Sequence, residues 1–193
     1  MSKRKRICDP RKTYLDNIHN RESLPTHVVV SAVQGLFRVA DRGDEKYLMP
    51  LLDSGDKAIA SAALSTLRIH WSEMPHLMDR IVEFASEYPH NDEENILQLS
   101  AIRAIEEYAI SNDSMVLRLV EIAERYRELP DSFEAHQANA AAWEALANLT
   151  GEKITGKDDI ELTWNIHGEA SEKIRERIRE SILVHIDNRC GVT

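Results

Sequence analysis

A pattern of small and apolar residues recurs four times along this chain of 193 residues. The pattern occupies positions i, i+4, i+5, i+7 and i+8, which lie on one face of a helix. Its copies begin at Val28, Ile59, Leu97 and Ala138, at offsets of 31, 38 and 41 residues. Such offsets are typical of solenoids built from helix pairs. The other members of the four copies are Ala32, Val33, Gly35 and Leu36; Ala63, Leu64, Thr66 and Leu67; Ala101, Ile102, Ala104 and Ile105; and Ala142, Trp143, Ala145 and Leu146.

Prolines, glycines and capping residues divide the chain between these copies. Asp9-Pro10 is a suitable N-cap and first position for a short cap helix, and Asp56 can cap a later one. Repeat four has no obvious second helix. These breaks therefore predict three complete helix pairs and a fourth repeat with only its first helix. The expected helices are one after Pro10, then 25–40 with 47–52, 56–71 with 75–87, 96–108 with 114–128, and one from 133 onward.

The pattern changes beyond Gly151. Residues 151–168 predict an ordered loop or a short helix tied down by Trp164. A highly charged helix is expected from 169 to 187, with one apolar stripe. A single stripe is typical of the last element of a solenoid, and a coiled-coil partner for it is the alternative. The stripe comprises Ile174, Ile178, Ile182, Leu183 and Ile186.

These patterns together predict an all-α fold, an α-α superhelix of three to four helix pairs with an N-terminal and a C-terminal capping helix. We expect residues 1–24 to form a basic tail plus the cap helix. Residues 25–152 would form the repeat array, and 153–193 the ordered loop and the charged capping helix. Only seven glycines and six prolines interrupt the chain, as expected for a mainly helical protein.

The repeats resemble HEAT repeats, in particular the short HEAT-like repeats of bacterial proteins, over about residues 25–152. The likeness is clearest in segment 43–56 and in segment 59–64, Ile-Ala-Ser-Ala-Ala-Leu, which are similar to the family's Asp, helix B, Asp, Val-x-x-x-Ala-Leu. The chain departs from the family at Ala60 and Arg68, where Arg and Gly are frequent. The resemblance implies stacked antiparallel helix hairpins whose second helices line a concave side.

The net charge of −9 is unevenly distributed. The first 12 residues carry six basic and one acidic side chain, whereas the rest carries 18 basic and 32 acidic ones and is therefore at −14. An acidic body repels polyanions, so we expect a basic or mixed-charge protein partner. Nucleic acid would bind at most weakly, through a tail that otherwise is a solvated terminus. The basic residues of that tail are Lys3, Arg4, Lys5 and Arg6.

The lack of a targeting signal and the positions of the two cysteines favour a cytoplasmic location. The chain has no apolar run of 18 residues, which predicts no membrane span, and no apolar segment follows the basic tail as a secretory signal would require. Cys8 and Cys190 lie near opposite ends, where two unpaired thiols in a reducing compartment are expected. A bridge between them would require the ends of the array to meet.

The sequence predicts no catalytic residue, no cofactor and no metal. It contains no Walker loop, GxGxxG, GxSxG or HExxH motif. His70, Glu73 and His76 lie across an expected turn without the spacing of one helix face. His136 and His185 are expected to be surface or partly buried structural residues.

Neighbouring carboxylates on a helix point about 100° apart and do not converge as an acid/base pair. Such pairs are Glu93-Glu94, Glu106-Glu107 and Asp158-Asp159.

The resemblance to HEAT-like repeats makes an enzyme the alternative to a binding protein, because some proteins with this repeat are enzymes. Deoxyhypusine hydroxylases of this fold hold two irons with paired His-Glu dipeptides, and this chain has no His-Glu dipeptide. Alkylpurine DNA glycosylases of this fold use aromatic residues and an acid in a basic groove. Trp71, Trp143 and Trp164 could supply the aromatic groups, but Trp143 falls on a core position and the body is acidic. Bilin-lyase relatives share the repeat, yet no residue here marks a pigment site.

Our first hypothesis is therefore a non-catalytic protein-binding module that uses the exposed face of its second helices. Acidic ridges with interspersed arginines favour steering of a basic partner. Adaptors and toxin-neutralising immunity proteins are binders of this kind, and size and charge favour immunity by analogy alone. The alternative is a HEAT-like enzyme acting on nucleic acid or through a metal. The expected partner-binding residues are Asp79, Arg80, Glu83, Glu87, Arg118, Glu121, Glu124 and Arg125.

Overall fold

The computed structural model describes residues 9–68, 75–87, 92–125, 132–165 and 167–190. Throughout this part the chain is all-α, with packed helix pairs and no strand, which confirms the predicted fold class. Contacts within the chain divide it into two compact units, Met1–Glu73 and Met74–Thr193. None of the described helices combines the length and the apolar character needed to cross a bilayer.

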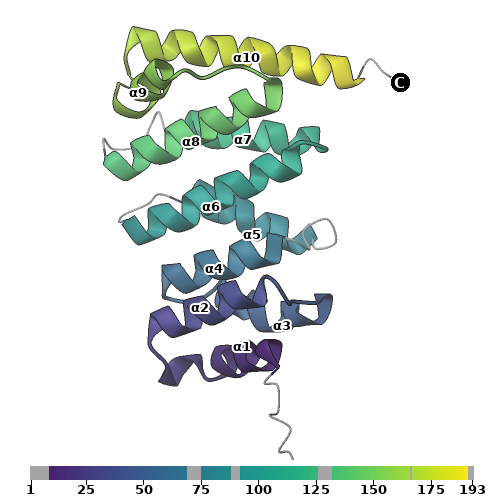
Figure 1. The fold of residues 1–193 in the computed structure, drawn as a ribbon. Helices are drawn as coiled ribbons and strands as arrows, with labels where there is room; N and C mark the ends of the chain where they lie inside the picture. Colours follow the sequence, from purple (N-terminus) through teal and green to yellow (C-terminus); the bar gives the residue numbers. More distant parts are fainter. Residues whose placement is uncertain (1–8, 69–74, 88–91, 126–131, 166, 191–193) are drawn as a thin grey trace, which may run out of the picture. The chain divides into compact units, whose positions relative to one another are not determined.

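The first unit is organised around its central helix (Figure 1). That helix, α2, packs against both α1 and α4. The two predicted caps are confirmed, because Asp9 accepts from the backbone N–H of Arg11 at the start of α1 and Asp56 accepts from Ala58 and Ile59 at the start of α4. The elements are α1 Pro10–His19, α2 Thr26–Leu36, α3 Glu45–Leu48 with the 3₁₀ turn Met49–Leu51, and α4 Lys57–Leu67.

Small residues let these helices approach closely. A Cβ atom at Gly35 of α2 would lie 2.6 Å from the ring of Tyr14 in α1, so only glycine fits without moving that ring. Thr66 of α4 donates its hydroxyl proton to the backbone carbonyl of Val33 in α2, at 3.3 Å. Both contacts involve template positions, which shows that the repeated pattern marks helix contacts.

One buried ion pair joins α1 to the turn before α3. The carboxylate of Asp44 is only 1% exposed and accepts from Arg11 Nε at 3.0 Å and Nη2 at 2.6 Å. The backbone N–H of Asp41 donates to the same carboxylate, at 3.0 Å. Burial raises the pKa of Asp44, but the hydrogen bonds from Arg11 and from the Asp41 backbone outweigh it and hold the pKa below its usual value.

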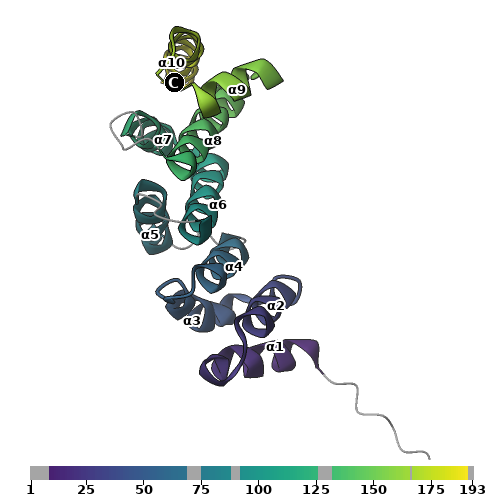
Figure 2. The ribbon, with the colours of Figure 1, turned by 90° about the vertical axis from the view of Figure 1, so that its left-hand side faces the viewer.

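The second unit has two layers of helices (Figure 2). Helices α5 and α7 form one layer and α6 and α8 the other, and α6 packs against α5, α7 and α8. Both α9 and α10 pack against α8. The elements are α5 Pro75–Ser86, α6 Asp92–Ala109, α7 Asp113–Arg125, α8 Phe133–Thr150, α9 Gly156–Trp164 and α10 Glu169–Cys190.

The repeated template marks the buried seams of both units. Eighteen of its twenty positions are buried, and the other two, Val28 and Gly35, are partly so. Ala104 of α6 and Ala142 of α8 are fully buried, and the much larger Trp143 of α8 is also completely buried. Small side chains shorten the distance between helices, and one large ring fills the space that remains.

Residues 156–164 form a helix, α9, rather than a loop. Thr155 and Asp158 make a capping box at its start. The expectation that Trp164 ties this segment down holds only in part: its ring lies 5.2 Å from that of Phe133 on α8, but the side chain is 63% exposed and Leu162 is the buried residue. The two side chains lie about 200° apart on the helix, so Leu162 faces the core, whereas Trp164 reaches α8 at its first residue, Phe133.

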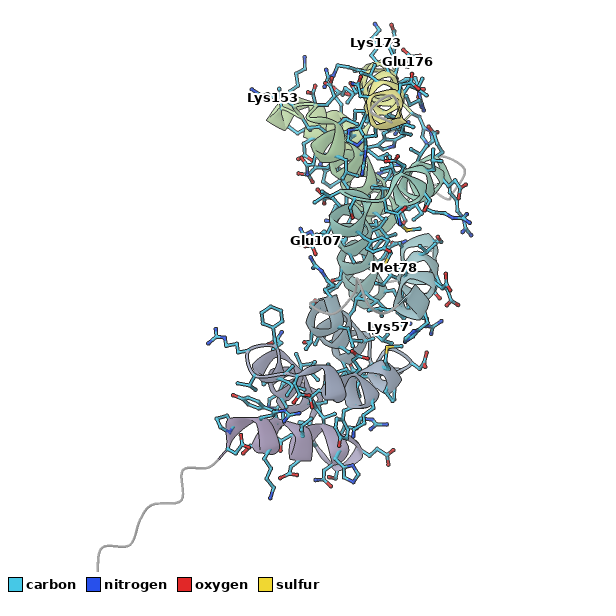
Figure 3. The ribbon with its side chains drawn as sticks, turned by 90° about the vertical axis from the view of Figure 1, so that its right-hand side faces the viewer. Lys57, Met78, Glu107, Lys153, Lys173 and Glu176 are labelled. Atoms are coloured by element: carbon cyan, nitrogen blue, oxygen red, sulfur yellow. The ribbon has the colours of Figure 1, made fainter. Side chains whose placement is uncertain are left out.

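The C-terminal helix α10 carries the predicted stripe with two differences. Ile174, Ile178 and Ile182 are buried as expected, but Leu183 is 65% exposed because it lies about 100° from Ile182 around the helix. The stripe also contains Arg175, which is only 1% exposed. The outward side of α10 is charged, as Lys173 and Glu176 show in Figure 3.

Helix α10 follows repeat four, whose second helix was not evident in the sequence. It packs on α8, the first helix of that repeat, and its arginines form ion pairs with α7. Arg179 binds Glu124 at 2.6 Å and Arg189 binds Asp113 at 2.9 Å. Helix α10 therefore packs on α8 and is joined to α7 by these two ion pairs.

Several residues named above lie outside the described part of the chain. They are the basic tail at 3–6, Cys8, His70, Trp71, Glu73 and residues 126–131. Cys190 ends α10, but its side chain is not described.

The Asp44 ion pair predicts a pH-dependent stability of the first unit. Because the folded pKa is below the usual value of 3.8, the stabilisation is complete above that value and is lost as pH falls through the folded pKa. We expect Asp44→Asn to lower the free energy of unfolding at pH 7 by about 1–3 kcal/mol. The difference from the parent protein should shrink below pH 3.8, as measured by urea unfolding across pH.

Asp41→Asn is the matched control, because Asp41 contacts the same Arg11 but is exposed. It should change the free energy of unfolding by less than about 0.5 kcal/mol. Equal losses in both variants would contradict the role of burial.

The seam between α6 and α8 predicts a steric limit at Ala142. Leucine there has no space and should lower the free energy of unfolding by about 1–3 kcal/mol. Ala170→Leu on the exposed side of α10 adds the same atoms and should stay within about 0.5 kcal/mol of the parent protein. Chemical denaturation followed by circular dichroism measures both, and a tolerated Ala142→Leu would show that the seam is loosely packed.

Candidate protein-binding face

Helices α5 and α7 contact each other side by side in the second unit. Each buries one side, through residues such as Leu77 and Ile81 on α5 and Val116 and Leu119 on α7. Their charged residues are thereby turned to the opposite side. An amphipathic helix with a buried apolar stripe fixes the direction of its polar face.

All eight predicted binding residues lie on this layer, with Glu87 directly after the end of α5. Six are exposed, whereas Arg80 and Glu124 are partly buried. We call the set the α5/α7 face. It comprises Asp79, Arg80, Glu83, Glu87, Arg118, Glu121, Glu124 and Arg125.

Two ion pairs within single helices neutralise part of the α5/α7 face. Arg80 pairs with Glu83 on α5, and Arg118 Nη1 lies 2.7 Å from Glu121 Oε2 on α7, both at i,i+3 spacing. The guanidinium of Arg80 also lies 4.6 Å from the ring centroid of the buried Phe84, which fixes its position. The face is therefore of mixed charge rather than uniformly acidic.

Glu124 has a structural partner from another helix. Its Oε1 accepts from Arg179 Nε at 2.7 Å and Nη2 at 2.6 Å, and Arg179 Nη1 also binds Glu172 at 2.9 Å. Burial lowers the pKa of Arg179, but the hydrogen bonds to Glu172 and Glu124 outweigh it and raise the pKa above its usual value. Glu124 thus holds α10 against α7.

A buried polar cluster lies behind this ion pair. The Cζ atoms of Arg179 and Arg175 lie 5.2 Å and 5.9 Å from the Trp143 ring centroid. Asn139 accepts from Arg175 Nη2 at 3.2 Å and donates to the backbone carbonyl of Ala123 at 3.0 Å. The cluster joins α7, α8 and α10 through polar contacts and cation–π contacts with one ring.

The cluster could not be predicted from the sequence, because its members come from three helices and Trp143 lies 32 residues before Arg175 in the chain. One signal was present: Arg175 directly follows Ile174 on the predicted apolar stripe and precedes Arg179 by one turn. An arginine at the edge of a stripe that also faces a predicted core tryptophan is a candidate for cation–π contact.

The other residues considered for metal binding or catalysis do not form a site in the described part of the structure. No group of three His, Cys, Asp or Glu side chains able to hold a metal ion occurs among the described residues. His136 and His185 are partly buried, as predicted. Hydrogen bonds from the backbone and side chain of Thr155, aided by Arg177, hold the pKa of Asp158 below its usual value despite its burial. This carboxylate therefore has a structural role at the start of α9.

Comparison with family models, with curated proteins and with solved structures finds no match for this chain. Arguments about its function therefore depend on the geometry of its own residues.

The two kinds of ion pair on α7 predict different coupling energies. A double-mutant cycle with Glu124→Gln and Arg179→Gln should give about 1 kcal/mol, because this pair is partly buried and doubly hydrogen bonded. The exposed pair tested by Arg118→Gln and Glu121→Gln should give less than about 0.5 kcal/mol. Urea unfolding measures both cycles, and equal couplings would contradict the structural role of Glu124.

Proposed function

We propose that this protein is a non-catalytic protein-binding module of HEAT-like construction, and that its α5/α7 face binds a basic or mixed-charge protein. The observation that carries the proposal is the arrangement of exposed charges in two adjacent rows on a layer backed by a close-packed seam. A rigid support reduces the entropy lost when a partner docks.

The charges of the α5/α7 face suit a partner that exchanges ion pairs. The pairs Arg80–Glu83 and Arg118–Glu121 are solvent-accessible, and such pairs contribute little to stability. A partner can replace them at low cost. Within the described part of the chain, Asp79, Glu87 and Arg125 have no ion pair and add further fixed charge to the same layer.

Glu124 is the exception among the eight residues. Because its carboxylate is already bound to Arg179, we assign binding to the other seven residues and a supporting role to Glu124. Adaptors and toxin-neutralising immunity proteins both work by such surface contact, and the identity of the partner distinguishes between them.

Affinity capture from native lysate, followed by mass spectrometry, tests the proposal. The triple variant Glu83→Lys, Glu87→Lys, Glu121→Lys should reduce recovery of at least one captured protein about tenfold or more, because each reversal replaces an attraction with a repulsion. The control variant Glu176→Lys, Glu180→Lys, Asp187→Lys makes the same change in net charge on exposed positions of α10. It should leave the recovery of that protein unchanged.

Recovery that is equal in the parent protein and both variants would show that the α5/α7 face is not the binding surface. The enzyme alternative has its own readouts in metal analysis of the purified protein and duplex DNA binding over a range of salt. Stoichiometric iron or zinc, or DNA affinity that falls steeply with salt, would favour the enzyme instead.

A further inference from the structure

A groove lies on the other layer of the second unit, between α6, α8 and α9. It has a volume of about 360 Å³. Ala140 and Ala141 of α8 line it, the first buried and the second partly exposed, and Leu99 contributes from α6. The small alanine side chains leave the space, and the longer residues around them form its walls.

Two aromatic rings form one wall of the groove. Phe133, the first residue of α8, and Trp164, the last residue of α9, have ring centroids 5.2 Å apart at an interplanar angle of 33°. They are 43% and 63% exposed, so most of the Trp164 surface faces water. Exposed aromatic residues beside a groove are typical anchors of protein interfaces.

Two carboxylates line the same groove from different helices, Glu144 from α8 and Asp159 from α9. Neither has an ion pair or a side-chain hydrogen bond among the described residues. The adjacent Asp158 differs, since it accepts from the Thr155 backbone and binds Arg177. No basic residue is among the described residues that line the groove. The site therefore offers uncompensated negative charge beside an aromatic face.

The apolar surface continues beyond the groove. Ile160 lies one turn before Trp164 on α9 and is 58% exposed, and Ile96 lies one turn before Leu99 on α6 and is 54% exposed. An apolar surface that extends along two helices favours a protein segment over a single small molecule.

We propose that this groove binds a segment of a protein partner through an arginine side chain. The guanidinium stacks on Trp164 and is paired by Glu144 and Asp159, while its aliphatic stem covers Ala141. Arginine fits better than lysine because its planar group stacks on aromatic rings and binds two carboxylates at once. This site lies on the opposite layer from the α5/α7 face and goes beyond the proposed function.

Peptide titration of the full-length, ¹⁵N-labelled protein tests the proposal. The probes are the capped peptides Ac-Ala-Leu-Xaa-Leu-Ala-NH₂ with arginine, lysine or citrulline at Xaa, since citrulline keeps the shape of arginine and removes its charge. The arginine peptide should shift the indole N–H resonance of Trp164, identified by its loss in Trp164→Phe. It should bind about tenfold more tightly than the citrulline peptide.

Variants separate charge from shape. Glu144→Gln and Asp159→Asn should each weaken the arginine peptide about threefold and leave the citrulline peptide unchanged. Glu176→Gln on α10 is the matched control and should change neither. If Trp164→Phe disturbs α9, the two carboxylate variants still decide the question, because their side chains have no partner in the described fold.

Equal binding of the arginine and citrulline peptides would overturn the proposal, as would an unmoved Trp164 resonance at millimolar peptide. A lysine peptide that binds as tightly as the arginine peptide would overturn the assignment to arginine. The triple variant Glu83→Lys, Glu87→Lys, Glu121→Lys should bind the arginine peptide like the parent protein. The proposal for the groove and the proposal for the α5/α7 face can therefore be confirmed or overturned independently.

Discussion

Close packing of small side chains at helix contacts is the constraint on which the structure depends. In the first unit the contact of α1 with α2 requires Gly35, and in the second Ala104 of α6 and Ala142 of α8 are completely buried in helices that pack on each other. Close approach brings backbone atoms into van der Waals contact and leaves no room for a larger residue. The orientation of every outward-facing side chain follows from which residues these seams bury.

The end of the helix array is held by polar contacts as well. Arg175 and Arg179 approach the buried ring of Trp143, and Glu124 and Glu172 bind the outer of the two guanidinium groups. Bringing two positive groups to one ring is favourable only when carboxylates compensate their charge. The strongly charged composition of α10 is thus partly a requirement of the fold, and only its outer side is available to solvent.

The seams could be predicted from the sequence because they depend on local helical periodicity. The template at 28–36, 59–67, 97–105 and 138–146 needed no knowledge of the partner helix. The environments of Trp164 and Glu124 could not be predicted from local periodicity. Whether Trp164 or Leu162 is buried depends on how a nine-residue helix is rotated, and Glu124 binds a residue 55 positions later. Tertiary contacts decide both.

The two outward layers of the second unit differ in how their charges are compensated, and this difference has a physical meaning. On α5 and α7, most carboxylates are paired within a helix or with α10. Beside Trp164, Glu144 and Asp159 remain unpaired among the described residues, next to apolar surface that faces water. Leu162 already anchors α9, and the two unpaired carboxylates add no favourable contact to the described fold, because like charges repel. The physical rationale of this arrangement is therefore a cationic group from outside the chain, which would gain from both the ring and the carboxylates.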